Sequence, residues 1–173
     1  MASARELLAT IKEAAERLNR TSESATAHIV ELDKFLAANS PGVEVWLHSG
    51  AASDRKGGLI RILEEEVTNA EQHKVNGYYI LGYARCEDGE LGIAVASCAT
   101  PSGQQWVTSA RMPELLQVKR LSKAPRHVKI AAMEHMQEFL AQLAWAAKKA
   151  ASDAENATVP FTEAMNPQKQ APK

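Results

Sequence analysis

The sequence predicts an α+β fold with a long N-terminal helix, a small and mainly antiparallel sheet of three to five strands, and a long C-terminal helix. Apolar residues recur at helical spacing towards both ends of the chain, and between them two apolar runs flank the turn pair Asp88-Gly89. A sheet and helices that each have an apolar face bury those faces against one another. We therefore expect a single domain over residues 1–152, followed by a flexible, disordered tail over residues 153–173.

The first helix begins at a capping-box pattern, Ser3 to Glu6. Its seam alternates steps of four and three residues, as a packed helix requires: Leu7, Ile11, Ala14, Leu18, Thr21, Ala25, His28, Leu32 and Phe35. The middle of this seam is weak, so two helices with a joint near residues 19–22 are the alternative to one long helix, which we favour. The helix either packs on the sheet or projects and pairs with its counterpart in another subunit.

Residues 78–99 predict a β-hairpin around Asp88-Gly89. A two-residue turn would place Tyr79 opposite Cys98 and Tyr83 opposite Ala94, with an aliphatic core on the other face. The face with the two tyrosines then packs under a helix, or it lines a pocket or a subunit interface. A longer turn with a bulge would shift one strand by one residue and exchange its faces.

Shorter elements are predicted around this hairpin. Residues 43–48 alternate as strands do. Residues 59–66 predict a strand or a short helix, and Ile60 and Ile62 favour the strand. Residues 67–77 are polar and predict a loop, and residues 113–116 predict one helical turn. The last helix is expected to run from Pro125 to about Ala151, on an apolar stripe at helical spacing: Val128, Ala132, Met136, Phe139, Leu143, Ala146 and Ala150.

Composition excludes several classes of protein. The formal charge of −1 predicts neither general attraction to nucleic acid nor charge-driven disorder. No apolar run is long enough to span a membrane, and charged residues near the N-terminus interrupt any signal-peptide core. Cys86 and Cys98 would lie roughly 23 Å apart in the hairpin, too far for a disulfide. Two free thiols favour a reducing compartment, so we expect a cytoplasmic protein.

The motifs of catalytic and metal sites are weak or missing. None of the five histidines pairs with a second ligand at a recurring metal-site spacing, and neither cysteine has a histidine nearby in sequence. Residues 50–58 contain glycines and Lys56 but depart from the phosphate-binding loop pattern. We therefore predict no catalytic, cofactor-binding or metal-ligating residue, and we expect a protein that is not an enzyme.

A basic segment is the main charge feature of the chain. Within residues 115–133 it carries positive residues and one histidine, with no acid before Glu134: Lys119, Arg120, Lys123, Arg126, His127 and Lys129. Its counterpart is nucleic acid or another polyanion, an acidic protein, or the acidic run 64–66 of the same or a neighbouring chain.

Several aromatic residues are candidates for an interface or a pocket: Trp46, His48, Tyr79, Tyr83 and Trp145. Two long helical stripes and an apolar sheet face favour a non-enzymatic interaction or assembly protein that forms a homo-oligomer, with a dimer favoured. The first alternative is binding of nucleic acid or another polyanion through residues 119–129. The second is a small-ligand or enzyme pocket near Tyr79 and Tyr83.

Overall fold

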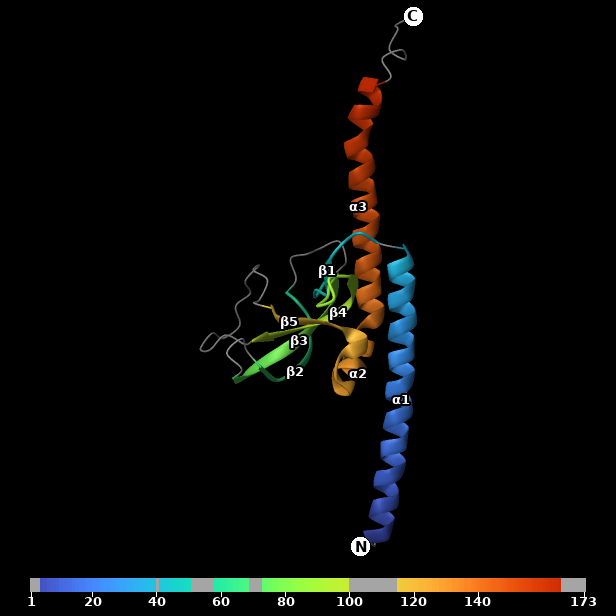
Figure 1. The fold of residues 1–173 in the computed structure, drawn as a ribbon, viewed down its shortest axis with the longest axis vertical. Coiled ribbons are helices and arrows are strands. Elements are labelled where there is room, and N and C mark those ends of the chain that lie inside the picture. Colours follow the sequence, from blue (N-terminus) through green and yellow to red (C-terminus); the bar gives the residue numbers. More distant parts are fainter. Residues whose placement is uncertain (1–3, 40, 51–57, 69–72, 100–114, 166–173) are drawn as a thin grey trace, which may run out of the picture.

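The structure is a computed structural model, and it describes residues 4–39, 41–50, 58–68, 73–99 and 115–165 (Figure 1). The elements follow in this order: α1 (Ala4–Asn39), β1 (Val45–Trp46), β2 (Arg61–Thr68), β3 (Lys74–Arg85), β4 (Leu91–Ala99), β5 (Leu115–Arg120), the 3-10 helix η1 (Leu121–Lys123), α2 (Arg126–Glu134) and α3 (Met136–Met165). The predicted α+β class, with a long helix at each end of a small antiparallel sheet, is confirmed.

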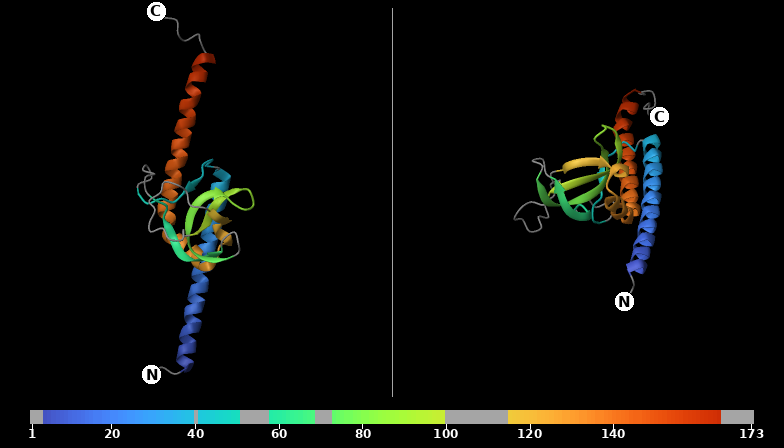
Figure 2. Two further views of the ribbon diagram at one scale, coloured as in Figure 1. Left: turned by 90° about the vertical axis from the view of Figure 1, so that its left-hand side faces the viewer. Right: turned by 60° about the horizontal axis from the view of Figure 1, so that its bottom comes forward.

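The five strands form one sheet in which every pair is antiparallel. The path runs β1-β3-β4-β5, and β2 also pairs with β3. Since β4 occupies one edge of β3, the strands β1 and β2 share the other edge, β1 beside Gly82 and Tyr83 and β2 beside residues 74–80. The long helices lie together on one side of this sheet, as the two views of Figure 2 show.

The hairpin of β3 and β4 forms where it was predicted, but its register differs by one residue. Tyr83 lies opposite Ile93 and Tyr79 opposite Ser97, instead of Ala94 and Cys98. The reason is a three-residue turn, closed by a hydrogen bond of 2.9 Å from the Cys86 amide to the Glu90 carbonyl. Gly89 has a φ of 81°, the left-handed conformation that completes such a turn with a bulge.

The shifted register decides which side chains share a face. The main core lies between the helices and the face that carries Leu81, Tyr83, Ile93 and Val95, and the helices contribute apolar side chains that include Phe139. The opposite face carries Ile80, Ala96 and Cys98 together with Tyr78, and Trp46 packs against it. Both faces of the hairpin are therefore apolar and buried, as expected, but with different members.

The N-terminal region forms one continuous helix, α1, as favoured from the sequence. Half of the predicted seam is packed, since Ala25 is buried and Leu32 half-buried, but the buried neighbours Ile29 and Leu36 replace its alternate members. His28 is exposed and the Phe35 side chain is 63% exposed. The sequence contains both sets at heptad spacing, and tertiary packing selects the more aliphatic one.

The C-terminal helical region differs from prediction at two points. It divides into α2 and α3 at His135, whose φ of −103° and ψ of 0° leave the helical range. The His135 amide bonds the Ala132 carbonyl at 3.1 Å, which tightens the last turn of α2. The helix α3 also continues to Met165 instead of ending near Ala151, so much of the predicted tail is helical. The alanine-rich sequence after Ala147 accounts for this, because alanine has the highest helix propensity.

Three predictions about the connecting segments are revised. Strands β2 and β3 extend into residues 67–68 and 74–77, where a loop was predicted. Residues 115–116 begin β5 instead of a helical turn, because the free edge of β4 pairs with them. The other expectations for residues 51–57, 69–72, 100–114 and 166–173 lie outside the described residues.

The helices give the molecule an elongated shape. The first half of α1 and the last part of α3 leave the body in opposite directions, so the N- and C-terminal ends lie far apart (Figure 1). Within the described ranges, the helices contain no stretch that is both long and apolar enough to cross a membrane.

Candidate functional site

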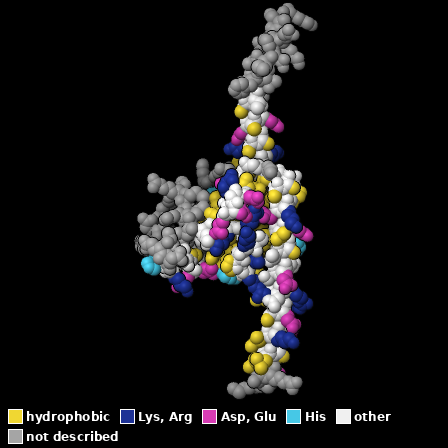
Figure 3. Space-filling model, viewed as in Figure 1, with side chains coloured by type: hydrophobic (Ala, Val, Ile, Leu, Met, Phe, Trp, Pro, Cys, Tyr) yellow, Lys and Arg dark blue, Asp and Glu magenta, His cyan; other side chains and the backbone are white. Residues whose placement is uncertain are grey.

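The first half of α1 extends beyond the body, and we call residues 4–20 the outer α1 segment. All side chains of residues 6–20 are exposed. Several are large and apolar, with exposed fractions from 45% to 66%: Leu7, Leu8, Ile11 and Leu18. Figure 3 shows hydrophobic side chains gathered at this end of the molecule. Contiguous exposed apolar surface of this kind marks an interaction site in soluble proteins.

This apolar surface continues the packing face of α1. Within the body, a line of half-buried and buried residues of α1 recurs in steps of three and four: Ser22, Ala25, Ile29, Leu32 and Leu36. Thr26, Val30 and Asp33 widen this line. The same steps taken towards the N-terminus reach Leu18, Ala15, Ile11 and Leu8. The face that packs on the body thus carries on past it, where the described part of the chain leaves it exposed.

The last part of α3 repeats this arrangement with smaller residues, and we call residues 151–165 the outer α3 segment. Phe139, Leu143 and Ala146 are buried on the body. The stripe continues in steps of four and three through Ala150, Ala154 and Ala157. Side chains 151–158 are exposed. Over the side chains that the structure describes, 6–20 of α1 and 150–158 of α3, the two seams therefore differ in size, large in α1 and small in α3.

Within the body, Arg120 joins three carboxylates, and we call Asp33, Asp88, Glu90 and Arg120 the Arg120 cluster. The guanidinium lies 2.6 Å from Asp33, 2.7 Å from Asp88 and 3.1 Å from Glu90. Asp33 also accepts the Ile93 amide at 2.8 Å. The cluster connects α1, the β3–β4 turn and the end of β5.

The cluster has a clear electrostatic effect. The hydrogen bond to Asp88, followed by Asp33, raises the pKa of Arg120. Conversely, the Arg120 hydrogen bond and then the Glu90 amide lower the pKa of Asp88 below its usual 3.8. A Cβ at Gly92 would lie 3.0 Å from Asp33 and closer still to Arg120, so glycine leaves room for the pair. The Arg120 guanidinium is therefore already paired with carboxylates of the same chain.

The other members of the basic segment lie in different surroundings. His127 Nε2 lies 2.9 Å from Glu65, within the acidic run that was one of its expected counterparts. Glu65 also hydrogen-bonds Tyr79, and burial followed by this bond raises the pKa of that tyrosine. Arg126 donates a hydrogen bond to Asn19 of α1. Lys119 and Lys129 are half-buried and Lys123 is exposed.

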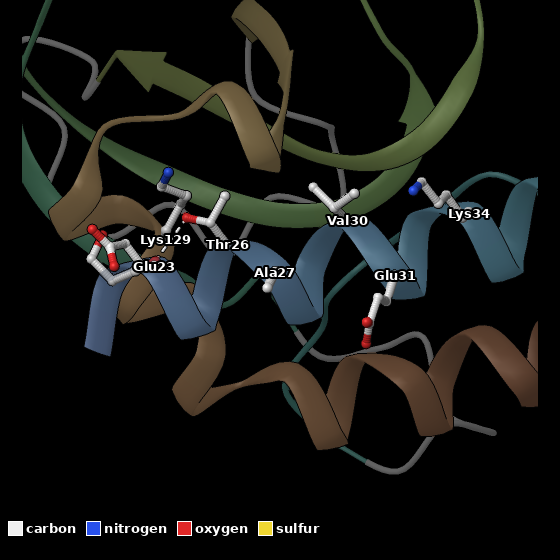
Figure 4. Close-up of a pocket in the computed structure, with 8 residues that line it drawn as sticks. Glu23, Thr26, Ala27, Val30, Glu31, Lys34 and Lys129 are labelled. Atoms are coloured by element: carbon white, nitrogen blue, oxygen red, sulfur yellow. Dashed lines mark hydrogen bonds between the residues drawn. The ribbon is translucent and has the colours of Figure 1, made fainter. Parts of the chain in front are cut away.

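A shallow groove of about 620 Å³ follows α1 beside α2 (Figure 4). Seven lining residues come from α1 and one from α2: Ser22, Glu23, Thr26, Ala27, Val30, Glu31, Lys34 and Lys129. Two acids and two lysines balance each other in charge, so the lining has no net preference for an anion or a cation.

The predicted aromatic candidates do not converge on one site. Tyr83 is 1% exposed in the helix-covered core, whereas Trp46 packs on the opposite face of the sheet over Gly82. The backbone of His48 is held by Gln142, which accepts its N–H at 3.0 Å and donates to its carbonyl at 2.7 Å. Trp145 lies on α3, where the Lys149 ammonium is 5.5 Å from the centre of its ring.

The described residues provide little for metal or thiol chemistry. Among them, His, Cys, Asp and Glu side chains form no group of three that could hold a metal ion. Cys86 and Cys98 are free and buried. Burial raises the pKa of Cys86 to about 11 and that of Cys98 to about 12. Both thiols are therefore almost fully protonated at neutral pH and are weak nucleophiles.

Sequence reasoning missed two polar side chains that position other groups, Asp33 and Gln142. Each interrupts an apolar helix stripe, and each proves to hydrogen-bond backbone groups of a strand segment. A polar residue at a packed position of a helix was the available signal, because buried polar groups need partners.

Comparison of the chain with known protein families, with curated proteins and with solved structures gave no match.

Proposed function

We propose that this chain is a non-enzymatic interaction or assembly protein that self-associates through its long helices, with a dimer as the favoured form. The observation that carries this proposal is the apolar packing face of α1, which continues through Leu18, Ile11 and Leu8 where the described chain does not cover it.

The energetics of the outer α1 segment support a partner. Complete burial of one leucine or isoleucine side chain contributes about 1.5–3 kcal/mol, so three such residues per copy provide substantial driving force. Most helical stability in proteins comes from tertiary packing of an apolar face, which the outer α1 segment lacks within the described chain. Packing against a partner would stabilise the helix and cover its apolar residues together.

The sheet is a weaker candidate for self-association than the helices, because both of its faces are already buried in the described chain. The polyanion alternative retains Lys119, Lys123, Arg126 and Lys129, since Arg120 and His127 contact acids of the same chain whereas Arg126 bonds the neutral Asn19. Neither alternative is supported by a structural observation as direct as the exposed apolar stripe of α1.

Size-exclusion chromatography with light scattering tests the proposal. We expect the wild type to be a dimer, and the variant Leu8→Gln, Ile11→Gln and Leu18→Gln to be a monomer with an intact domain by circular dichroism. The matched control, Glu6→Gln, Glu13→Gln and Arg17→Gln, changes the other faces of the same segment and should stay dimeric. A monomeric wild type would contradict the proposal. Absorbance at two wavelengths reports co-purified nucleic acid in the same run.

A further inference from the structure

We propose that the outer α1 segment of one copy pairs antiparallel with the outer α3 segment of a second copy. This inference rests on the proposed self-association and specifies which surfaces meet. A two-fold axis perpendicular to the helices would relate the copies, and the dimer would close through two identical α1–α3 contacts.

The first support is the direction and length of the two segments. They leave the body in opposite directions along the long axis of the molecule (Figure 1). A perpendicular two-fold axis reverses that direction, so it places the outer α3 segment of one copy beside the outer α1 segment of the other. At about 1.5 Å per residue, residues 4–20 span about 25 Å and residues 151–165 about 22 Å. The two segments therefore match in length.

The second support is the size of the apolar residues. The α1 seam has large residues at Leu8, Ile11 and Leu18, whereas the α3 seam between residues 150 and 158 has alanine at 150, 154 and 157. Large side chains pack well against small ones, because the two rows interdigitate. Two alanine seams packed on each other would bury little apolar area, so pairing of α3 with its own copy gains less.

The third support is charge. The outer α3 segment has three acidic residues and no basic one, which gives a net charge of −3. The outer α1 segment has four basic and three acidic residues, a net charge of +1. Pairing like with like would oppose charges of the same sign, whereas α1–α3 pairing brings opposite signs together. The antiparallel direction also places the positive N-terminal end of α1 near the negative C-terminal end of α3.

Disulfide trapping in chains with two substitutions tests this arrangement. In an antiparallel pair the tips meet, so Leu8→Cys with Ala157→Cys, and Leu18→Cys with Ala150→Cys, should give covalent dimers on mild oxidation. The matched controls exchange the partners, as Leu8→Cys with Ala150→Cys and Leu18→Cys with Ala157→Cys. Each exchange moves the α3 cysteine by seven residues, or about 10.5 Å along the helix axis. This shift exceeds the Cα separation of about 7 Å that a disulfide spans. We expect a several-fold higher yield from the tip-to-tip pairs, with the bond located by peptide mass spectrometry.

Light scattering on the unoxidised wild type separates the two levels of the proposal. A covalent dimer from Leu8→Cys alone, joined between two α1 helices, would overturn the α1–α3 pairing and leave self-association intact. A dimeric protein that gives no α1–α3 disulfide, or one in which the exchanged pairs react better, would also overturn the pairing. A monomeric wild type would overturn both the pairing and the proposed function.

Discussion

Arg120 and Asp33 connect the end of β5 to the C-terminal part of the first helix. Their charged atoms lie 2.6 Å apart, and the two side chains are only 15% and 14% exposed. The second oxygen of Asp33 accepts the amide of Ile93 in β4. One carboxylate thus holds α1 against two neighbouring strands.

Replacement of Asp33 by alanine should lower the free energy of unfolding by about 2–4 kcal/mol, because it leaves Arg120 short of a partner and the Ile93 amide without its acceptor. Urea denaturation followed by circular dichroism measures the change. Glu31→Ala, on an exposed position of the same helix, is the control and should change stability by less than about 0.5 kcal/mol. Equal stabilities of the two variants would show that the ion pair contributes little.

Gly82→Ala should destabilise the protein by about 1–3 kcal/mol through overpacking. The added Cβ would lie 2.7 Å from the Val45 carbonyl oxygen and 2.8 Å from a ring atom of Trp46. Thermal unfolding measures the loss, and tryptophan fluorescence should change with it. Gly58→Ala is the matched control, because its Cβ would meet nothing within 4 Å. If both variants unfold at the wild-type temperature, Trp46 does not pack closely over Gly82.

The Arg120 cluster predicts loss of stability in acid. The pKa of Asp88 is lower in the folded state than its usual 3.8. The contribution of ionised Asp88 to the free energy of unfolding is therefore present in full at pH values well above 3.8. This contribution is lost as the pH falls through the lowered pKa that Asp88 has in the folded protein. Denaturation between neutral and acid pH should show a shallower acid decline for Asp88→Asn than for wild type. The control Asp153→Asn, on an exposed part of α3, should follow the wild-type slope; identical slopes for all three proteins would argue against the coupling.

Cys86 and Cys98 should react slowly with a thiol reagent at neutral pH while the protein is folded. Their pKa values are raised to about 11 and about 12 by burial, so the reactive thiolate is scarce. Both should react rapidly in denaturant. Glu44→Cys, at an exposed position outside both outer segments, supplies a reactive thiol as a control. Fast modification of the native wild type would mean that one of these strands opens readily.

The class and order of the main elements could be predicted from sequence, because helical spacing and the Asp88-Gly89 turn are local signals. The register could not, since two- and three-residue turns both accept this pair, and only the conformation of Gly89 distinguishes them. Strand β5 was missed because it forms by pairing with the free edge of β4, and its own sequence pattern does not indicate a strand. Every second member of the α1 seam was displaced by one residue, because Ile29 and His28 fit equivalent heptads, whereas Ala25 and Leu32 pack as predicted.

The candidate site was predictable only in part. Ile11 and Leu18 of the outer α1 segment were predicted as part of a seam, with Leu7 in place of Leu8, and the acidic run 64–66 was among the expected counterparts of the basic segment. Asp33 was not expected as the partner of Arg120, because 87 residues separate them. The local sequence around a single acid in a helix does not indicate which distant residue it will contact. The fold alone brings the two together.

The position of Asp33 also bears on the order of folding. Its contacts to Ile93 and Arg120 close loops of 60 and 87 residues, whereas the β3–β4 hairpin forms between neighbours in sequence. Long loops cost more entropy to close, so we expect α1 to dock after the β3–β4 hairpin has formed. Hairpin positions should then have high φ-values and Asp33 a low one, so that its loss speeds unfolding far more than it slows folding.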